Sequence, residues 1–279
     1  MSSATGKRGA TMTILGLGSL LSERSARTTF PSLSHFRLVQ LHGYRRVFAH
    51  TPALFVRRGI ADARTLEMAS LSAEECEGCG FVCTAFEVVD EGMDAFNERE
   101  EEFELRLVSF SELNGDGSNG DGSADASSGR GSCVPGTDGR ALLCVGSTDG
   151  AYVSRWGRER WEREYVSRGL STIWQWPKGS ALKPCAAYLR HCVLAARRSV
   201  SKKQKKRCFL PLPKCRTPTF AICHQFNSKN RRLGPTAEDS FLDETYLVDR
   251  KTTIREYLAA NPHIMTMLPP PDLQERYGG

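Results

Sequence analysis

The chain has no long apolar run. Nothing in its 279 residues approaches the ~18 consecutive apolar residues that a membrane-spanning helix needs. A short apolar run at Thr13–Leu21 follows a charged N-terminus, and it lacks the small-residue cleavage pattern of a secretory signal. We therefore expect no membrane segment and a cytoplasmic location. A short plastid presequence stays open as an alternative, because the first acidic residue is Glu23.

The sequence also lacks the ligand clusters of a metal site. Its ten cysteines include one CxxC pair, Cys76 and Cys79, but the six histidines are scattered and no second pair exists. A structural zinc site needs about four ligands, usually as two such pairs. We therefore expect no metal, and we expect reduced thiols at a hairpin turn, since no secretion signal precedes them. His42, His50 and His191 are expected on the surfaces of strands or helices.

Acidic residues are missing from one basic segment, which accounts for the net charge of +6. Residues 197–232 contain twelve Lys or Arg and no Asp or Glu. Removing them from the 38 basic residues leaves 26 against 32 acidic residues, a net charge of −6. Nucleic acid is therefore not expected as a partner of the fold itself. Polyanion binding or nuclear import through this segment stays open.

Two segments show no periodicity of apolar residues. Residues 114–139 are dominated by Gly, Ser, Asp and Asn, so we expect a disordered insert. Residues 199–235 contain SKKQKKRC and several prolines, and we expect a solvated basic insert, with an imperfect gene model as the alternative. We predict a flexible N-terminus at residues 1–12 and a single domain at residues 13–277 that carries both inserts.

Elsewhere the pattern predicts strands first and helices later. Strands are expected at Thr13–Gly18, at Phe36–Phe48 with a break at Gly43, at Leu66–Leu71 paired with Gly80–Val89, at Phe103–Phe110 and at Leu142–Ser147. Helices are expected from Asp90 through Phe96, at Tyr152–Arg168, at Cys185–Arg198, and after a capping box at Thr253 and Glu256, ending before Pro262. This order indicates the α+β class with a mixed sheet.

The first feature with chemical potential is a glycine loop, Gly16-Leu17-Gly18-Ser19-Leu20, directly after the first strand. Glycines let consecutive backbone N–H groups point into one concavity, which suits an anion. The GK[ST] end of a nucleotide-binding P-loop is missing, and Leu21 stands where GxGxxG requires its last glycine. A nucleotide site is therefore disfavoured.

The second feature is an acidic run, Asn97-Glu-Arg-Glu-Glu-Glu102, followed by Phe103. Four acids in five positions usually form a solvated helix end. This run lies between an apolar helix pattern and a strand that needs a buried face. One carboxylate can therefore be drawn into a pocket, where loss of hydration raises its pKa toward a value useful in proton transfer.

In order and spacing, these motifs resemble the γ-glutamylcyclotransferase-like superfamily. Its usual loop reads G-Y-G-S-[NL], and a later R-E-x-x-Y carries the acid; here they correspond to Gly16–Leu20 and to Glu100, about eighty residues on. The helix after Pro184 resembles the family's Pro-then-Tyr helix and puts Tyr188 at the pocket wall. The segment FLDETYLVDRKTTIREYL near the end of the sequence resembles that of plant or algal members of the superfamily. The resemblance covers about Thr13–Val108, Ala141–Arg198 and Asp239–Tyr277.

This resemblance implies a small barrel flanked by helices and the release of 5-oxoproline from a γ-glutamyl compound, without metal or organic cofactor. Glutathione, γ-glutamyl amino acids and γ-glutamyl-ε-lysine all fit as the small-molecule substrate. The resemblance makes Glu100 the general base and acid, while Leu17, Gly18, Ser19, Leu20 and Tyr188 bind the substrate. Leu17 and Phe103 stand where the family commonly has tyrosines, which bears on the choice of substrate.

Two other functions stay open from the sequence. One is a non-catalytic protein of the same fold that binds a γ-glutamyl compound or an amino acid. The other is an interaction protein that acts through residues 197–232.

Overall fold

A computed structural model of the chain describes residues 11–89, 96–97, 99–113, 139–199 and 236–277. Most of the expected N-terminal tail and of both inserts, and the expected helix cap at Asp90, lie outside these residues. The first strand begins at Thr11 and the fifth begins at Gly139. The strands therefore extend slightly into the predicted tail and the predicted first insert.

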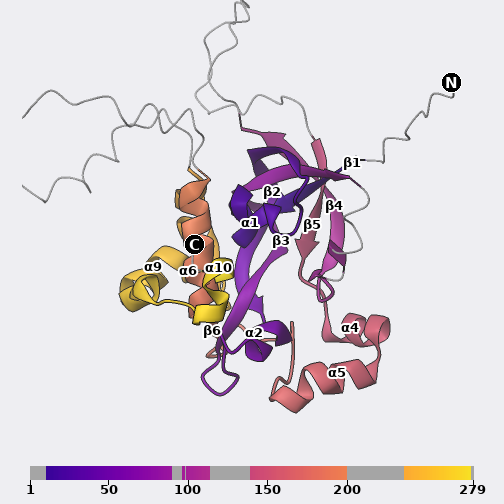
Figure 1. Ribbon diagram of the computed structural model, residues 1–279, viewed down its shortest axis with the longest axis vertical. Helices are drawn as coiled ribbons and strands as arrows, with labels where there is room; N and C mark the ends of the chain where they lie inside the picture. Colours follow the sequence, from indigo (N-terminus) through magenta and orange to yellow (C-terminus); the bar gives the residue numbers. More distant parts are fainter. Residues whose placement is uncertain (1–10, 90–95, 98, 114–138, 200–235, 278–279) are drawn as a thin grey trace, which may run out of the picture.

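Five strands close into a mixed barrel (Figure 1). They are β1 (Thr11–Gly16), β2 (Ser34–His50), β3 (Glu67–Val89), β4 (Glu104–Glu112) and β5 (Gly139–Val145). Around the ring, β1 pairs with β3, β3 with β2, β2 with β4, β4 with β5, and β5 with β1 again. The β5–β1 pairing is parallel and the other four are antiparallel. The short β6 (Lys183–Pro184) and β7 (Thr245–Leu247) add parallel partners to β3 and β2.

Alternate residues of these strands enter two different cores. Leu15 and Ala85 belong to the larger core, whereas their neighbours Ile14 and Phe86 belong to a smaller one. Successive side chains of a strand point to opposite faces, so this division follows from the alternating pattern of the sequence. In the smaller core, the centroid of the Phe30 ring lies 5.5 Å from that of Phe86. The predicted α+β class and small barrel are confirmed.

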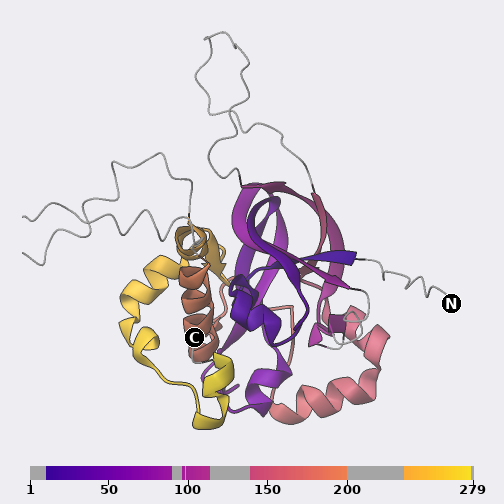
Figure 2. The same ribbon diagram turned by 45° about the horizontal axis from the view of Figure 1, so that its top comes forward.

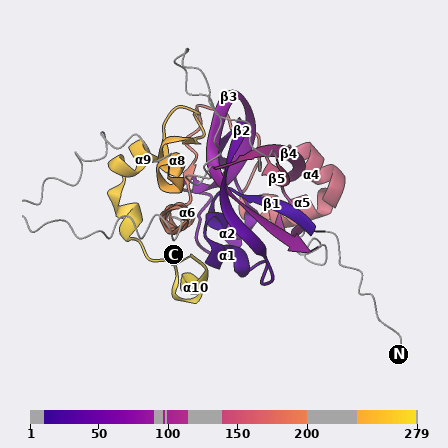
Figure 3. The ribbon, with the colours of Figure 1, turned by 90° about the horizontal axis from the view of Figure 1, so that it is seen from above.

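Helices flank the barrel on two sides (Figures 2 and 3). On one side lie α6 (Ala186–Arg198), α8 (Ala237–Asp243), α9 (Ile254–Ala260) and α10 (Gln274–Tyr277). On the other lie α4 (Asp149–Trp156) and α5 (Arg158–Glu164). The short elements are α1 (Glu23–Arg27), α2 (Ala53–Arg57) and the 3-10 turns Ser19–Leu21, Val166–Arg168, Pro262–Thr266 and Pro271–Leu273. Among the described residues, none of these helices has the length and apolar character needed to cross a bilayer.

The helix predictions are confirmed in two places and wrong in a third. Helix α6 occupies the expected segment, and α9 opens with the predicted capping box, in which the Thr253 N–H donates to Glu256 Oε2 at 2.8 Å. The single helix expected at Tyr152–Arg168 is instead split at Gly157, whose φ of 88° a continuing helix cannot accommodate.

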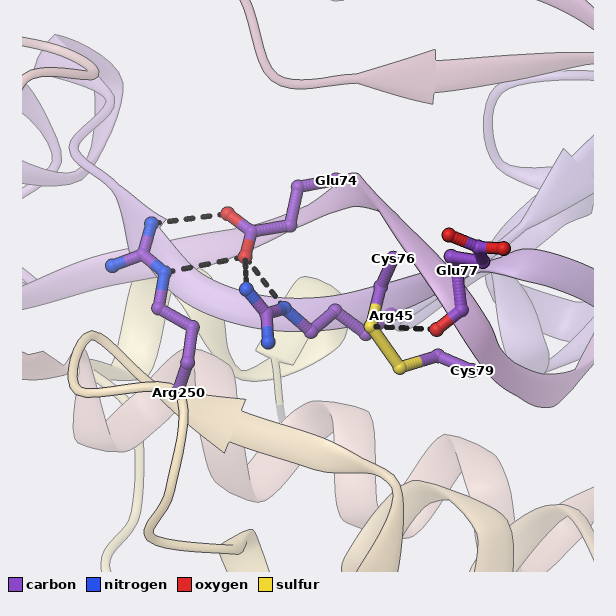
Figure 4. Close-up of a disulfide and its surroundings, with 6 residues drawn as sticks. All are labelled: Arg45, Glu74, Cys76, Glu77, Cys79 and Arg250. Atoms are coloured by element: carbon purple, nitrogen blue, oxygen red, sulfur yellow. Dashed lines mark hydrogen bonds and ion pairs between the residues drawn. A yellow bond between two sulfur atoms is a disulfide. The ribbon is translucent and has the colours of Figure 1, made fainter.

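The expected hairpin at the cysteine pair is also wrong. Residues on both sides of it belong to one long strand, β3, and both halves pair with β2. The register passes from His42 opposite Gly80 to Tyr44 opposite Glu75, so residues 76–79 bulge out opposite the intervening Gly43. Within this bulge Cys76 and Cys79 form a disulfide, in place of the reduced thiols expected from the sequence (Figure 4).

Beside the disulfide, one carboxylate ties the long strand pair to the C-terminal part of the chain. Glu74 lies 2.6 Å from the guanidinium of Arg45 on β2 and 3.0 Å from that of Arg250, which follows β7 (Figure 4). Burial alone would raise the pKa of Glu74, but the two arginines outweigh it and lower that pKa. These contacts are structural, since the charges satisfy each other.

Candidate functional site

The glycine loop requires both of its glycines. A Cβ at Gly16 would lie 2.5 Å from Thr84 Oγ1, and one at Gly18 would lie 2.9 Å from Tyr188 Oη. Real Cβ atoms do not approach other atoms this closely, so any larger residue forces the surroundings to move. The loop is therefore packed directly against β3 on one side and α6 on the other.

Two buried side chains hold the carbonyl groups of this loop. Thr84 Oγ1 donates to Leu20 O at 2.9 Å, and Arg46 Nη1 lies 3.4 Å from Leu17 O. The Arg46 guanidinium is fully buried against the rings of two phenylalanines, and its Nη2 donates to Ser240 Oγ at 3.1 Å. Burial lowers the pKa of Arg46 to about 10, which still leaves the group charged at neutral pH.

The loop's backbone donors are only partly engaged. Among the described residues, no hydrogen-bond acceptor faces the N–H of Leu17 or Gly18. The Ser19 N–H instead faces the sulfur of Cys192 on α6. The N–H groups of Leu17 and Gly18, two buried residues at the end of a strand, are therefore left without a hydrogen-bond partner among the described residues.

Tyr188, which was expected at the pocket wall, lies beside Gly18 of this loop. It lies on α6, and its ring centroid is 5.0 Å from that of Phe55. Its hydroxyl interacts with Cys192 and Ser70 and packs against Gly18. Burial, with a smaller effect from Cys192, raises the pKa of Tyr188 well above its ordinary value, so its hydroxyl stays protonated.

Glu100 lies just before β4 with its side chain 13% exposed. Its Oε1 is 2.9 Å from Nε of the preceding Arg99, and Arg99 in turn donates to Thr29 Oγ1. Burial raises the pKa of the Glu100 carboxyl, and the nearby Arg99 guanidinium, with a smaller effect from the His50 side chain, offsets this only in part. A pKa raised by burial is what the sequence predicted for one carboxylate of the acidic run.

A neighbouring acid has a different environment. Glu102 accepts a hydrogen bond from the Tyr165 hydroxyl, and its Oε2 lies 3.0 Å from Nε2 of His50. The ring of His50 is buried, with its centroid 4.4 Å from that of Trp174 and 4.6 Å from that of Phe103. Glu102 thus connects His50, at the end of β2, with Tyr165, which follows α5.

The expectation of surface histidines is wrong for His50 and His191, which are both buried, while His42 is exposed. His50 ends β2 in a stretch, residues 46–50, in which every residue is buried, so an alternating pattern of apolar residues does not identify it. Arg46 begins the same buried stretch. The polar character of both side chains concealed their burial.

The described structure brings Gly18, Ser19 and Tyr188 together. Glu100 is near enough for its negative charge to contribute to the raised pKa of Tyr188 and of Cys144. No hydrogen bond or ion pair within the described ranges joins Glu100 to the glycine loop itself. Within those same ranges, no group of three or more His, Cys, Asp or Glu side chains is arranged to hold a metal ion.

Sequence comparison matches the chain to no family profile and to no curated protein. Similar solved structures include one described as "Gamma-glutamyl cyclotransferase", with a TM-score of 0.39 and 10% identity over 75% of this chain and 93% of the other. A γ-glutamyl cyclotransferase specific to glutathione, from yeast, has a TM-score of 0.38 and 11% identity over 74% and 90%. An uncharacterised protein from Homo sapiens has a TM-score of 0.40 and 10% identity over 75% and 92%.

These structural neighbours include γ-glutamyl cyclotransferases, the superfamily that the sequence motifs resemble. With TM-scores of 0.40 or less and identities of 10–11%, these similarities assign neither a reaction nor a residue role to this chain.

Proposed function

We propose that the chain releases 5-oxoproline from a γ-glutamyl compound, with Glu100 as general base and acid. The observation that carries this proposal is the buried position of the Glu100 carboxyl, whose charge reaches Tyr188 beside the glycine loop. Burial raises the pKa of this carboxyl. It is therefore a stronger base than an exposed carboxylate, and it is an available acid once protonated.

The reaction is an internal displacement. The substrate's α-amino nitrogen attacks its own γ-carbonyl carbon, and a C–N bond forms that closes the five-membered ring. The amide C–N bond to the leaving group then breaks. Glu100 takes one proton from the attacking nitrogen and delivers one to the departing amine, so no water is consumed. Ring closure gains from proximity, with effective molarities of ~10⁵–10⁸ M for well-oriented groups.

The glycine loop has the complementary role in this proposal. The N–H groups of Leu17 and Gly18 would hold the substrate's carboxylate or the oxygen that becomes negative as the ring closes. Ser19 and Leu20 contribute less directly, because Cys192 faces the Ser19 N–H and the Leu20 side chain is buried. Tyr188 would bound the pocket opposite the loop.

The test uses the purified full chain, a panel of γ-glutamyl compounds and detection of 5-oxoproline. The panel contains glutathione, γ-glutamyl amino acids and γ-glutamyl-ε-lysine. Glu100→Gln is expected to abolish release, since an amide cannot take up the proton. Glu101→Gln is the matched control in the same acidic run, because Glu101 pairs with Arg160 near the surface. Near-normal turnover by Glu100→Gln would disprove the proposed role.

The second candidate is a binding protein of the same fold without turnover. The burial of Leu17 and Leu20 and the engagement of the Ser19 N–H favour it, because they leave the loop fewer ways to adjust around a reacting group. Calorimetry showing that members of the panel bind without 5-oxoproline release would select it.

An interaction role for residues 197–232 stays a prediction, since most of that segment lies outside the described residues. The observation that would support this role is salt-dependent binding to a polyanion that is lost when the segment is deleted.

A further inference from the structure

A cleft of about 340 Å³ lies on the helical side of the molecule. Four segments far apart in the sequence line it: α1, the end of α2, α6 and the C-terminal turn with α10. The ribbons of α1, α6 and α10 lie near one another in Figure 3. Arg58 Nη1 donates to Tyr277 Oη at 2.8 Å, which fastens the C-terminal helix to the end of α2. The cleft is therefore a product of the tertiary fold.

Positive charge predominates in this cleft. Two acids, Asp272 and Glu275, line it together with four arginines, so four positive and two negative charges leave a formal charge of +2. Across the described part of the chain, none of the four arginines forms an ion pair with a carboxylate. These arginines are Arg24, Arg58, Arg198 and Arg276.

Two arginines on the same helices but outside the cleft are paired with carboxylates. On α1, Arg27 lies 2.7 Å from Glu23, and on α6, Arg197 lies 2.8 Å from Glu238. The cleft therefore gathers four guanidinium groups that form no ion pair with a carboxylate of the described residues. This is the arrangement expected for a site that receives its negative charge from a ligand.

A buried histidine gives the cleft a second, independent feature. His191 on α6 lines it with only 6% of its surface exposed, and its Nδ1 has no hydrogen-bond partner in the described structure. Its Nε2 lies 3.5 Å from Ser25 Oγ. When the Ser25 hydroxyl donates to Nε2, the neutral ring carries its proton on Nδ1. A buried donor without an acceptor is costly, and a negative charge in the cleft beside it would offset part of that cost.

We propose that this cleft binds a small molecule carrying a phosphate-type dianion. Guanidinium groups match the oxygens of a phosphate in pairs. The volume exceeds that of the anion alone, so the ligand is an organic phosphate whose remainder fills the cleft. This site does not depend on the proposed cyclotransferase activity, because neither Glu100 nor the glycine loop lines it.

The protonation of His191 should respond to such a ligand. Burial, together with the charges of four arginines, lowers the pKa of His191 to about 4; they are Arg276, Arg198, Arg190 and Arg99. Asp272 and Glu275 are the acids that line the same cleft. A bound dianion would oppose the arginine charges and favour the imidazolium form. Ligand binding should therefore raise the pH at which His191 titrates.

The test uses the full chain and inorganic phosphate as probe, at a fixed ionic strength set with chloride. NMR of the His191 imidazole is followed as phosphate is added, with succinate as a parallel arm. We expect saturable binding of phosphate, weaker binding of succinate, and a His191 titration that moves to higher pH. Arg198→Gln and Arg24→Gln are each expected to weaken phosphate binding about tenfold, the effect of losing one charge-assisted hydrogen bond.

The matched controls are Arg197→Gln and Arg27→Gln, which remove the same charge from the same helices outside the cleft. They should change the affinity less than about twofold. An equal loss in cleft and control variants would overturn the proposal, because it would show only a response to net charge. Non-saturable binding, or succinate binding as tightly as phosphate, would overturn it too. All four variants replace exposed side chains, so the comparison does not depend on a disturbed core.

Discussion

His50 Nε2 and Glu102 Oε2 lie 3.0 Å apart in a nearly buried position at the end of the barrel. The same carboxylate accepts a hydrogen bond from Tyr165, whose pKa is raised by burial and by the charge of Glu102. Glu100, two residues earlier, has Arg99 as its ion-pair partner within the described residues. The two acids thus have separate expected roles, Glu102 in stability and Glu100 in chemistry.

The first prediction concerns Glu102→Ala. This change leaves the buried Tyr165 hydroxyl without its acceptor and removes the group that faces His50. We expect the free energy of unfolding to fall by about 2–3 kcal/mol, measured by urea denaturation. Glu101→Ala is the control, because its pair with Arg160 is partly exposed and should contribute less than about 1 kcal/mol. Equal losses from both changes would contradict the structural role of Glu102.

The second prediction concerns the pH dependence of turnover. A general base must be deprotonated, and burial raises the pKa of Glu100 above the ordinary carboxyl value of about 4.3. We expect kcat/KM to fall as the pH drops through that raised pKa. A plateau that persists down to the ordinary carboxyl pKa, in steady-state assays of the wild-type protein, would argue against Glu100 as the base.

The same shift gives a third prediction, on stability, that is independent of turnover. An acid whose pKa is higher in the folded state binds its proton more tightly there than in the unfolded chain. Its penalty on the folded state is therefore absent below the ordinary carboxyl pKa and grows as the pH rises through the raised value. Glu100→Gln removes this titration. We expect its free energy of unfolding, relative to wild type, to increase with pH across that window, and a constant difference would contradict the assignment.

The fourth prediction concerns the disulfide between Cys76 and Cys79, which are three positions apart. Closing so small a ring restricts the unfolded chain modestly, and the loop-entropy relation gives about 2 kcal/mol. We expect the double change Cys76→Ser and Cys79→Ser to lower the free energy of unfolding by no more than this, and wild type in reductant should match it. Mass spectrometry after thiol alkylation checks the bond directly. Alkylation of both residues without prior reduction would contradict it.

The sequence predicted those parts of the fold that depend on local pattern. The alternation in Phe103–Phe110 corresponds to β4, and the capping box at Thr253 opens α9 as expected. The sequence also singled out the two glycines of the loop, and the structure shows that contacts at Gly16 and Gly18 leave no room for a Cβ. The signals for these features lie within a few residues of each other along the chain.

The remaining features depend on partners distant in the sequence. Residues 76–79 have the composition of a hairpin turn, and only the pairing of both flanking segments with β2 makes them a bulge. The burial of His191 depends on the C-terminal helix, where Tyr277 packs edge-on at 5.8 Å between ring centroids. Local composition cannot report such contacts, so the cleft around His191 was not predictable from the sequence.

The last prediction tests the contact between the glycine loop and α6. Gly18→Ala introduces a Cβ at 2.9 Å from Tyr188 Oη and 3.1 Å from Cys192 Sγ, so the loop and the helix must move apart. We expect a loss of about 1–3 kcal/mol in the free energy of unfolding, as for other overpacked sites. Adding Tyr188→Phe removes the closest atom and should restore part of that loss, although Cys192 Sγ remains tight. A double-mutant cycle measures the coupling, and strictly additive effects would show that the loop does not rest on Tyr188.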